Sequence, residues 1–482
     1  MKQIGAPASA ILNVMFRSTS LFFAAMILGA CVFDGSGISS GEGGGAPADL
    51  HHDGVAGERD FASVEAGRSE QGLLREDAGA DARADVSGDL SGDYRQGDLR
   101  HGDLRHGDGG GDSVPADVTT RQDVRPWYSG WSFRKEISIH GAKVGGSASL
   151  KNFPLLIRFD TGLKDKVHGG PVVQADGGDI LFTGADGTTQ LDHEIEDYDA
   201  VKGALVAWVK IPNLALASDT TIYIYYGSTN LADQWNRTAT WDEGGKNDFR
   251  GVWHLARAPQ KSTSITTQDA TSYGNDGRDP WGSFDLTNEV GGKIGKGFRS
   301  EKYEAVDVGK AASLDITGDV TISYWANFAS GGGQQEYAAP VWRHDGSQSI
   351  RTYLVYYHYD QHWGFSTTYA SDSQDYRDIS FSKSHADGKW HHWTVVRSFN
   401  TPGGGGTISF YFDGKLINTG TFRAGLTQAK STPTTHSYFG SLEGIFDEVR
   451  ISAVARSPEW IKASHESQKD SKFVAAGPEE KL

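Results

Sequence analysis

Two glutamates in the stretch DHEIEDYD have the spacing of a paired-carboxylate site. Glu194 and Glu196 are two residues apart, and side chains at that spacing share one face of a β-strand. Retaining glycosidases place an acid and a nucleophile in this way, with carboxyl groups about 5–5.5 Å apart. The alternative is an acidic strand edge that is solvated or binds a cation. We expect this alternative, with Glu194 and Glu196 kept as candidates for catalysis.

A third acid, Asp447, lies in the strand-like stretch GIFDEVRIS. Period-two alternation places Asp447 on one face with Ile445, Val449 and Ile451, and this aliphatic face should point into a core. A carboxylate in a core must be paired or must bind a metal. Pairing with an arginine or with backbone amides is the alternative to a metal.

The aromatic stretch YLVYYHYDQHWGF (353–365) is the best candidate for a ligand-binding face. Aromatic rings stack on sugars, and nearby polar groups bind the sugar hydroxyls. Alternation puts Tyr356 and His358 on one side of a strand. The predicted ligand-binding residues, on a concave face, are Tyr356, His358, Asp360, Trp363 and Asp372. The alternative is that these aromatic residues are plain core.

Cys31, the only cysteine of the 482 residues, follows ten apolar residues that begin at Leu21. That run is too short to span a bilayer, which needs ~20 residues, and it is typical of a signal peptide. LGAC (28–31) resembles the bacterial lipobox, whose cysteine receives lipid. The resemblance implies a signal peptide at 1–30, lipidation of Cys31 and a membrane partner through that anchor. Val32 then favours the outer membrane or cell surface of a bacterial envelope. A cleaved signal with a chance cysteine is the alternative.

Residues 31–125 have the composition of a disordered tether. Residues 32–125 contain 20 Asp or Glu, 9 Arg and no Lys, among many Gly, Ala and Ser. Such a segment buries too little apolar area to offset its chain entropy. The formal net charge of −16 for the whole chain also argues against a nucleic-acid partner, which needs clustered cations.

Two all-β domains follow, the first over residues 126–240. Its strand-like runs alternate in period two between turn motifs, which predicts a small antiparallel sandwich. The carrying stretches are WSFRKEISI, NFPLLIRFD, GGDILFTGADGTTQLDHEIEDYD, VAWVKIPNL and TTIYIYYGSTN. They resemble, in order, the bacterial domain of unknown function 2341. The resemblance implies a fold and no chemistry.

The second domain, residues 241–470, reads as a larger sandwich of jelly-roll type. Its stretches include GVWHL, DATSYGNDG, VTISYWANF, DGKWHHWTVV, ISFYFDGKLI and GIFDEVRISAVARSPEWI. These resemble laminin-G-like, concanavalin A-like lectin/glucanase domains. Ser457, Pro458 and Glu459 predict the start of a short helix, and residues 471–482 are expected to be a C-terminal tail.

The resemblance to these jelly rolls implies a possible structural calcium ion near the joined ends of the domain. Asp447 would be one ligand, and Asp269 and Asn275 the others if the terminal strands pair. Oxygen ligands of this kind suit calcium.

Taken together, these features predict a lipoprotein that displays two β-sandwiches for non-catalytic binding of carbohydrate or protein. The alternatives are a structural or envelope-assembly protein and, less favoured, a glycan hydrolase. We expect no enzyme, because the sequence shows no recognisable Ser-His-Asp triad, phosphate-binding loop or HExxH motif.

Overall fold

The computed structural model describes residues 126–482 except 231, 244–247, 257–266, 302–303, 330–336, 346–349, 359–361, 370–371, 383–385, 400–404 and 423–427. The predicted signal peptide, the predicted lipidation site Cys31 and the predicted tether lie outside the described residues. Among the described residues, no helix is both long and apolar enough to cross a membrane.

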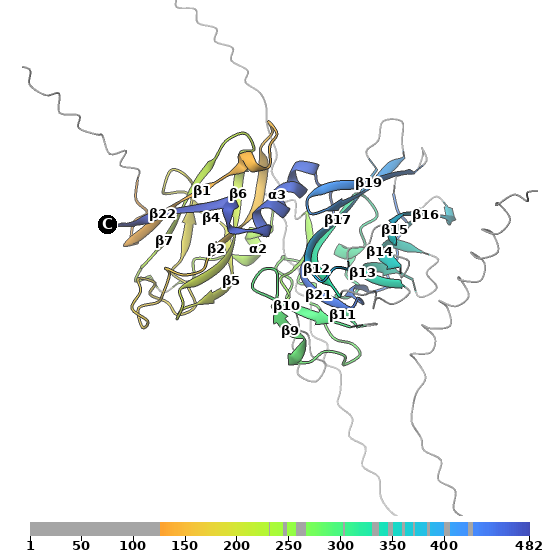
Figure 1. Cartoon of the computed structure of the whole chain (residues 1–482), viewed down its shortest axis with the longest axis horizontal. Helices are drawn as coiled ribbons and strands as arrows, with labels where there is room; N and C mark the ends of the chain where they lie inside the picture. The colour runs from red at the N-terminus through yellow and green to blue at the C-terminus, as the bar shows by residue number, and fades with distance from the viewer. Residues whose placement is uncertain are drawn as a thin grey trace, which may run out of the picture. The chain divides into compact units, whose positions relative to one another are not determined.

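The chain forms two antiparallel β-sandwiches, as the alternating patterns predicted (Figure 1). The first packs a five-stranded sheet on a three-stranded sheet. The five strands are, in spatial order, β22 (Val474–Lys481), β1 (Phe133–Ile139), β7 (Thr220–Tyr226), β3 (Leu181–Thr183) and β4 (Gln190–Leu191). The three are β2 (Leu150–Phe159), β6 (Ala204–Leu214) and β5 (His193–Asp199).

The last strand of the chain belongs to the first sandwich. β22 pairs antiparallel with β1, with Phe133 opposite Lys481 and Ile139 opposite Val474. The prediction that residues 471–482 form a C-terminal tail is therefore wrong. The stretch VAAGPEEK has little apolar content of its own, and its place is decided by the open backbone edge of β1.

The second sandwich packs an eight-stranded sheet on a six-stranded sheet. The eight are β19 (Lys415–Phe422), β18 (Gly406–Phe412), β17 (Trp390–Ser398), β12 (Val320–Phe328), β21 (Gly444–Ser452), β10 (Lys296–Ser300) and β9 (Glu289–Gly291), with β8 (Phe249–Trp253) on β21. The six are β11 (Ala305–Asp307), β20 (Ser437–Gly440), β13 (Tyr337–His344), β14 (Arg351–His358), β15 (His362–Tyr369) and β16 (Asp372–Ser382).

Local sequence signals fix several elements of this sandwich. The Asp413–Gly414 turn between β18 and β19 has φ of 48° and 72°, the left-handed pair that a tight hairpin requires. Helix α3 (Pro458–Lys469) begins where predicted, and the Ser457 side chain accepts a hydrogen bond from the Trp460 amide at 3.2 Å.

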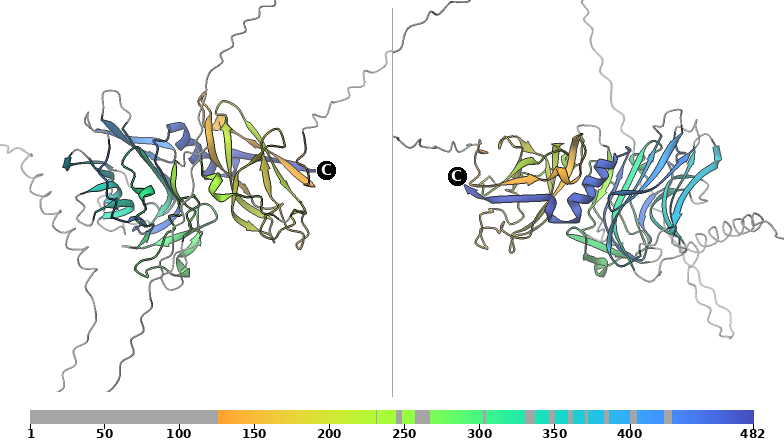
Figure 2. Two further views of the ribbon diagram at one scale, coloured as in Figure 1. Left: turned by 180° about the vertical axis from the view of Figure 1, so that it is seen from behind. Right: turned by 45° about the horizontal axis from the view of Figure 1, so that its top comes forward.

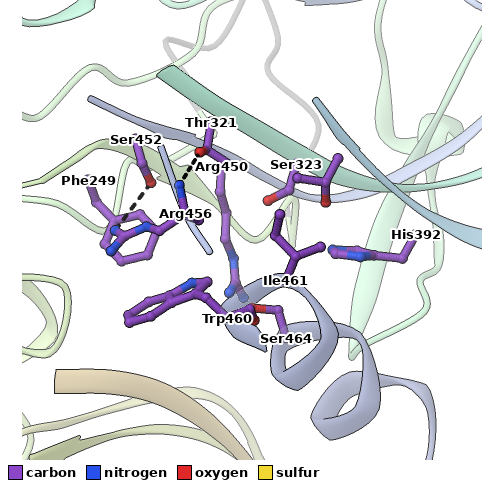
Figure 3. Close-up of a pocket in the computed structure, with 11 residues that line it drawn as sticks. Phe249, Thr321, Ser323, His392, Arg450, Ser452, Arg456, Trp460, Ile461 and Ser464 are labelled. Atoms are coloured by element: carbon purple, nitrogen blue, oxygen red, sulfur yellow. Dashed lines mark hydrogen bonds between the residues drawn. The ribbon is translucent and has the colours of Figure 1, made fainter. Parts of the chain in front are cut away.

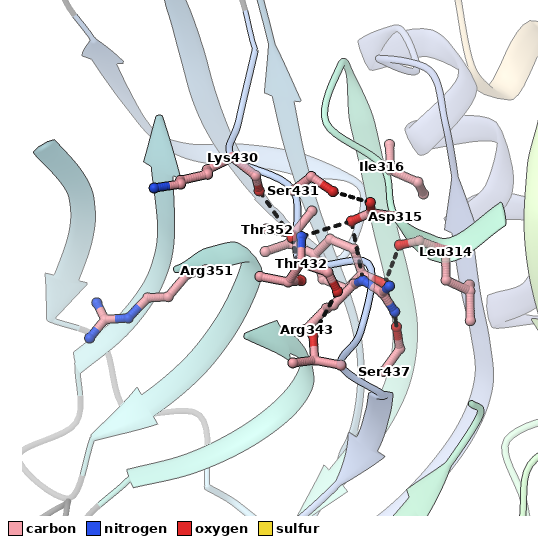
Figure 4. Close-up of polar contacts among 12 residues, drawn as sticks. Leu314, Asp315, Ile316, Arg343, Arg351, Thr352, Lys430, Ser431, Thr432 and Ser437 are labelled. Carbon is pink, nitrogen blue, oxygen red and sulfur yellow. Dashed lines mark hydrogen bonds and ion pairs between the residues drawn. The ribbon is translucent and has the colours of Figure 1, made fainter. Parts of the chain in front are cut away.

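Charged groups are buried at one end of this core and are paired there (Figure 4). Arg343 is fully buried; its Nη1 donates to Ser437 Oγ at 3.0 Å, and its Nε lies 3.4 Å from Asp315 Oδ1. Arg397, also fully buried, donates to the carbonyl oxygen of Ile316 at 2.7 Å. These side chains hold the segment before β12 in place.

A separate apolar cluster joins the two sandwiches. It combines Trp208 and Leu156 of the first sandwich with Phe249, Val252 and Ile294 of the second. Helix α3 contacts both β2 and β19, and Figure 2 shows it between the two sandwiches. The described part of the chain thus forms one compact unit, with the acidic stretch of β5 at the junction.

Candidate functional site

The acidic pair of β5 is buried at this junction. The Glu194 residue is 5% exposed, and its Oε2 accepts a hydrogen bond from Trp241 Nε1 at 2.6 Å. The Glu196 side chain is 2% exposed, and its Oε2 accepts from Trp208 Nε1 at 2.8 Å. The acidic edge is therefore not solvated, because the indole rings and the second sandwich cover both carboxylates, and cation binding stays a prediction.

His254, just after β8, connects the acids of the two sandwiches. Its Nδ1 lies 2.7 Å from Glu448 Oε1 and 3.6 Å from Glu196 Oε2, and its Nε2 lies 3.2 Å from Glu194 Oε2. The imidazole also stacks on Trp208, with ring centroids 5.7 Å apart. We refer to Glu194, Glu196, His254, Asp447 and Glu448 as the junction cluster.

A β-bulge in β21 aims two of these acids at the junction. Opposite β12, Ser323 faces Arg450 and Trp325 faces Asp447, so the two residues between them on β21 face one residue of β12. Glu448, inside the bulge, has φ of 54°, which is unusual for a residue with a side chain. Such strain persists only where the surroundings fix it, and it is concentrated at functional sites.

The bulge also overturns the face predicted for Asp447. Val449 and Ile451 point into the core of the second sandwich, whereas Asp447 Oδ2 accepts a hydrogen bond from the amide of Ile294, a residue of the junction. The extra residue reverses the alternation between positions 447 and 449. Asp447 is fully buried, as expected, but on the opposite face.

Burial makes two acids of the cluster hard to ionise. It raises the pKa of Glu196 to about 8, and the nearby charge of Glu448 adds to the effect. Burial, again reinforced by Glu448, raises the pKa of Asp447 well above its ordinary value. Among the described residues, Glu196 Oε1 and Asp447 Oδ1 have no hydrogen-bond partner.

His254 of the cluster and the neighbouring Arg450 favour the ionised form of Glu448. Burial lowers the pKa of His254, but attraction to Glu448, Glu194 and Glu196 outweighs it and holds the pKa well above its ordinary value. Burial raises the pKa of Glu448, yet His254 and Arg450 bring it below its ordinary value. Both pKa shifts favour an ion pair between the imidazole and Glu448, whose Nδ1 and Oε1 lie 2.7 Å apart.

Arg450 links the junction cluster to a polar cleft beside α3 (Figure 3). Its Nη2 donates to Glu448 Oε2 at 2.6 Å, and its guanidinium lies over the ring of Trp208 at 4.2 Å. Arg450 also lines this cleft, together with Ser323 of β12, His392 of β17 and Arg456 of the segment between β21 and α3. Arg456 in turn pairs with Glu243 at 2.6 Å.

The geometry of the cluster permits metal binding. Glu196, His254 and Glu448 each offer one ligand atom, and these atoms all lie within 4.8 Å of one another. Within the described ranges, this is the one such group of three or more His, Cys, Asp or Glu residues.

The predicted calcium ligands are not assembled in the structure. Both carboxylate oxygens of Asp269 accept hydrogen bonds, from the amides of Val252, Thr271 and Asn275 at 2.9–3.0 Å and from the Thr271 hydroxyl. The side-chain amide of Asn275 bonds to the Arg250 carbonyl. Asp269 therefore stabilises its own loop through backbone amides, and Asp447 sits instead in the junction cluster.

The predicted ligand-binding residues are divided between the core and the surface. Trp363 is 2% exposed and packs in the core against Phe328 and Trp393, so the prediction that it faces a ligand is wrong. Tyr356 is half-buried on the opposite face of β14, over Gly364. Asp360 lies outside the described residues, as do the side chains of His358 and Asp372.

The outer face of the six-stranded sheet carries half-buried aromatic rings, and one exposed ring packs against them. Tyr438 of β20 stacks on Trp342 of β13 at 5.0 Å and on Trp281 at 5.7 Å, with interplanar angles of 18° and 16°. Trp281 is 52% exposed. Register pairs Trp342 with Leu354, so Tyr356, two residues further along β14, lies on the same face. We call Trp281, Trp342, Tyr356 and Tyr438 the aromatic stripe.

Polar groups flank this aromatic stripe. His436 Nδ1 lies 2.7 Å from Asp307 Oδ2, and its ring stacks beside Tyr438. Burial, with the Asp307 charge nearby, raises the pKa of Tyr438 to about 12. Its hydroxyl is therefore a neutral hydrogen-bond donor at every physiological pH.

Two family models match the chain, in different ranges. Residues 300–462 match the concanavalin A-like lectin/glucanases superfamily. The second sandwich is a concanavalin A-like domain. Residues 176–253 match a domain of unknown function (DUF2341), which confirms the predicted order of the two families. The DUF2341 match extends through β8, so it includes a strand of the concanavalin A-like domain.

The solved structures that are similar to this chain match it only weakly. None of the curated proteins matches. The receptor binding domain of botulinum neurotoxin mosaic serotype C/D is similar at 12% identity over 46% of this chain and 51% of its own, with a TM-score of 0.35. The binding domain of Paraclostridial Mosquitocidal Protein 1 is similar at 12% identity over 46% and 52%, with a TM-score of 0.33. The chain spans about half the length of these domains, and TM-scores this low support no inference about its ligand.

Sequence reasoning missed His254, Glu448 and the aromatic stripe apart from Tyr356. The stretch GVWHL had carried only a resemblance, and nothing in it sets His254 apart from an ordinary loop histidine. A signal existed for Glu448, because DEVR places adjacent acids beside an arginine in a strand that is otherwise buried. Trp281, in the loop before β9, had no periodic pattern around it.

Proposed function

We propose that this chain is a non-catalytic binding protein of the bacterial cell envelope, and that its concanavalin A-like domain holds a carbohydrate on the aromatic stripe. The observation that carries the proposal is the exposed ring of Trp281, stacked on Tyr438. A monomer rarely leaves a large aromatic side chain in solvent as part of a larger aromatic surface unless something binds there.

The chemistry around the rings suits a sugar. One face of a pyranose is apolar and stacks on an indole, while its hydroxyl groups need donors and acceptors at the rim. Asp307 supplies an acceptor, and His436 and the neutral Tyr438 hydroxyl lie next to it. A protein partner with a flat surface would bury less area against a narrow line of stacked rings. We therefore favour carbohydrate over protein as the ligand.

A catalytic role is not favoured for the acidic pair. Glu194 and Glu196 are buried between the sandwiches, and each accepts a hydrogen bond from a tryptophan. An acid that must protonate a glycosidic oxygen has to lie against the scissile bond in a site that admits substrate.

A glycan array probed with the purified chain tests the binding proposal, with titration of the glycans that respond. Trp281→Ala should weaken binding by about 30-fold, the usual effect of removing a dominant aromatic contact. Trp235→Ala is the matched control, because Trp235 is 40% exposed but lies in the segment before α2 (Arg237–Thr240), outside the stripe. Equal loss in both variants, or no glycan bound by the unmodified chain, would refute the stripe as a sugar site.

The envelope location rests on Cys31 and has its own test. In cells fed a labelled fatty acid, the unmodified chain should carry label and Cys31→Ser should not. Label retained by Cys31→Ser would remove the basis for the anchor and for the predicted outer-membrane or cell-surface location, while the binding proposal would stand.

A further inference from the structure

We propose that Glu196, His254 and Glu448 bind one divalent transition-metal ion that ties the two sandwiches together. The ion would be of the zinc or manganese class and structural in role. This inference goes beyond the binding function and does not depend on it.

The first reason is the convergence of three ligands from distant parts of the chain. Glu196 comes from β5 of the first sandwich, His254 from the loop after β8, and Glu448 from the bulge of β21. Their ligand atoms lie within 4.8 Å of one another, and the Glu448 backbone is held in a left-handed conformation there. A bound ion would compensate for that strain.

The second reason is that two buried carboxylate oxygens of the junction cluster accept no hydrogen bond from any described residue. Glu196 Oε1 and Asp447 Oδ1 have no hydrogen-bond partner among the described residues, and both side chains are at least nine-tenths buried. An acceptor left in that state costs about 1–3 kcal/mol. The absence of a side chain at Gly295 leaves room for Glu196, because a Cβ at that position would lie 2.8 Å from Glu196 Oε1.

The third reason is the carboxylate that contacts the other ring nitrogen of His254. While Nδ1 faces Glu196 and Glu448, Nε2 faces Glu194 at 3.2 Å, and Glu194 is fixed by the indole N–H of Trp241 at 2.6 Å. A carboxylate that accepts the far N–H of a ligating histidine fixes its tautomer and increases its basicity. Glu194 is therefore a positioning residue for His254.

The donor set indicates the class of metal. An imidazole nitrogen with two carboxylates suits zinc, iron or manganese, whereas calcium prefers six to eight oxygen ligands. The three ligand side chains are at most 9% exposed and come from both sandwiches, so the ion would fix the sandwiches relative to each other and would not act on a ligand.

The experiment compares the tag-free chain with Glu196→Gln, each unfolded in urea with chelator and refolded with Zn²⁺, Mn²⁺, Ca²⁺ or no metal. The unmodified chain should keep one ion more per molecule than the variant after dialysis, by elemental mass spectrometry. Its unfolding midpoint should rise by about 5 °C with Zn²⁺ or Mn²⁺ at 100-fold excess over Kd. Glu196→Gln should show neither effect, while its midpoint without metal stays near that of the unmodified chain.

Two controls keep the result unambiguous. Glu301→Gln makes the same chemical change at an exposed position and should respond like the unmodified chain. Ions held by His101 or His106 of the tether segment would be retained equally in Glu196→Gln and so cancel in the comparison. Should Glu196→Gln fail to refold, Glu448→Gln replaces it.

Three outcomes would overturn the proposal. The first is no difference in metal content between the unmodified chain and the variant. The second is an equal rise of the midpoint in both. The third is stabilisation by Ca²⁺ alone, which would contradict the assigned class of ion.

Discussion

Arg134 and Glu480 lie 346 residues apart in the chain, yet the Nη2 of the arginine is 2.7 Å from Oε2 of the glutamate. Arg134 is in β1 and Glu480 in β22, so the ion pair spans the contact between the first and last strands of the described chain. The guanidinium also lies over the ring of Trp127 at 4.4 Å. The last strand of the first sandwich therefore follows the whole second sandwich in the sequence.

Removal of β22 should destabilise the first sandwich. A chain ending at Phe473 loses the ladder to β1, and each backbone hydrogen bond contributes about 1 kcal/mol net, so we expect a loss of about 3 kcal/mol or more. Urea unfolding, followed by tyrosine and tryptophan fluorescence, measures it. Removal of Leu482 alone, which lies beyond the strand and is 78% exposed, is the control. Equal stability of the two truncated chains would show that β22 contributes nothing.

His193 should make the stability of the fold depend on pH. The side chain is fully buried, and burial lowers its pKa to about 4. The unfolded chain, with a pKa near 6.5, binds the proton first, so stability is lost as pH falls from about 6.5 to 4.

The expected size of this loss is about 2.5 kcal/mol between pH 7 and pH 4.5. Other groups titrate in the same interval, so the quantity to compare is the loss in the unmodified chain minus that in His193→Gln, by urea unfolding at both pH values. A difference near zero would mean that His193 is protonated in the folded state, through its contacts with the carbonyl oxygens of Ile180 and Leu191.

Local sequence patterns predicted the strands and the helix start, but they could not predict which strands pair over long distances in the sequence. Alternation identified the strands, and Ser457 identified the start of the helix, because each depends on a few neighbouring residues. The position of β22 depends on the open edge of β1, a strand far away in the sequence. The residues of β22 themselves do not indicate which strand they pair with. The bulge at Glu448 likewise depends on the partner strand β12, so a strict two-residue period placed Asp447 on the wrong face.

The same limit applies to the sites. A buried aromatic strand and an exposed one have similar composition, and Trp363 and Tyr356 come from one stretch but point to opposite faces. The acids Glu194 and Glu196 were visible as a pair, while their partner His254 lies 60 residues away from Glu194. Only the packing of one sandwich on the other brings them together.

Trp363→Ala tests whether Trp363 stabilises the core or binds a ligand. The ring packs against Trp393 at 4.0 Å and Phe328 at 4.9 Å, so its truncation should cost about 3–5 kcal/mol. Glycan affinity per folded molecule should stay unchanged, the reverse of the pattern expected for Trp281→Ala. A selective loss of affinity in a stable Trp363→Ala variant would restore the ligand role first predicted for this residue.

Asp269→Ala should destabilise the chain in a way that does not involve metal. The carboxylate accepts from the amides of Val252, Thr271 and Asn275 at 2.9–3.0 Å, and leaving these buried donors without an acceptor should cost about 3 kcal/mol. The loss should be the same with chelator as with Zn²⁺, because sites that share no partner contribute additively. Asn275→Ala, which keeps the Asp269 carboxylate, should cost less under both conditions. If chelator abolished the difference between Asp269→Ala and the unmodified chain, Asp269 would be a metal ligand after all, as the calcium prediction required.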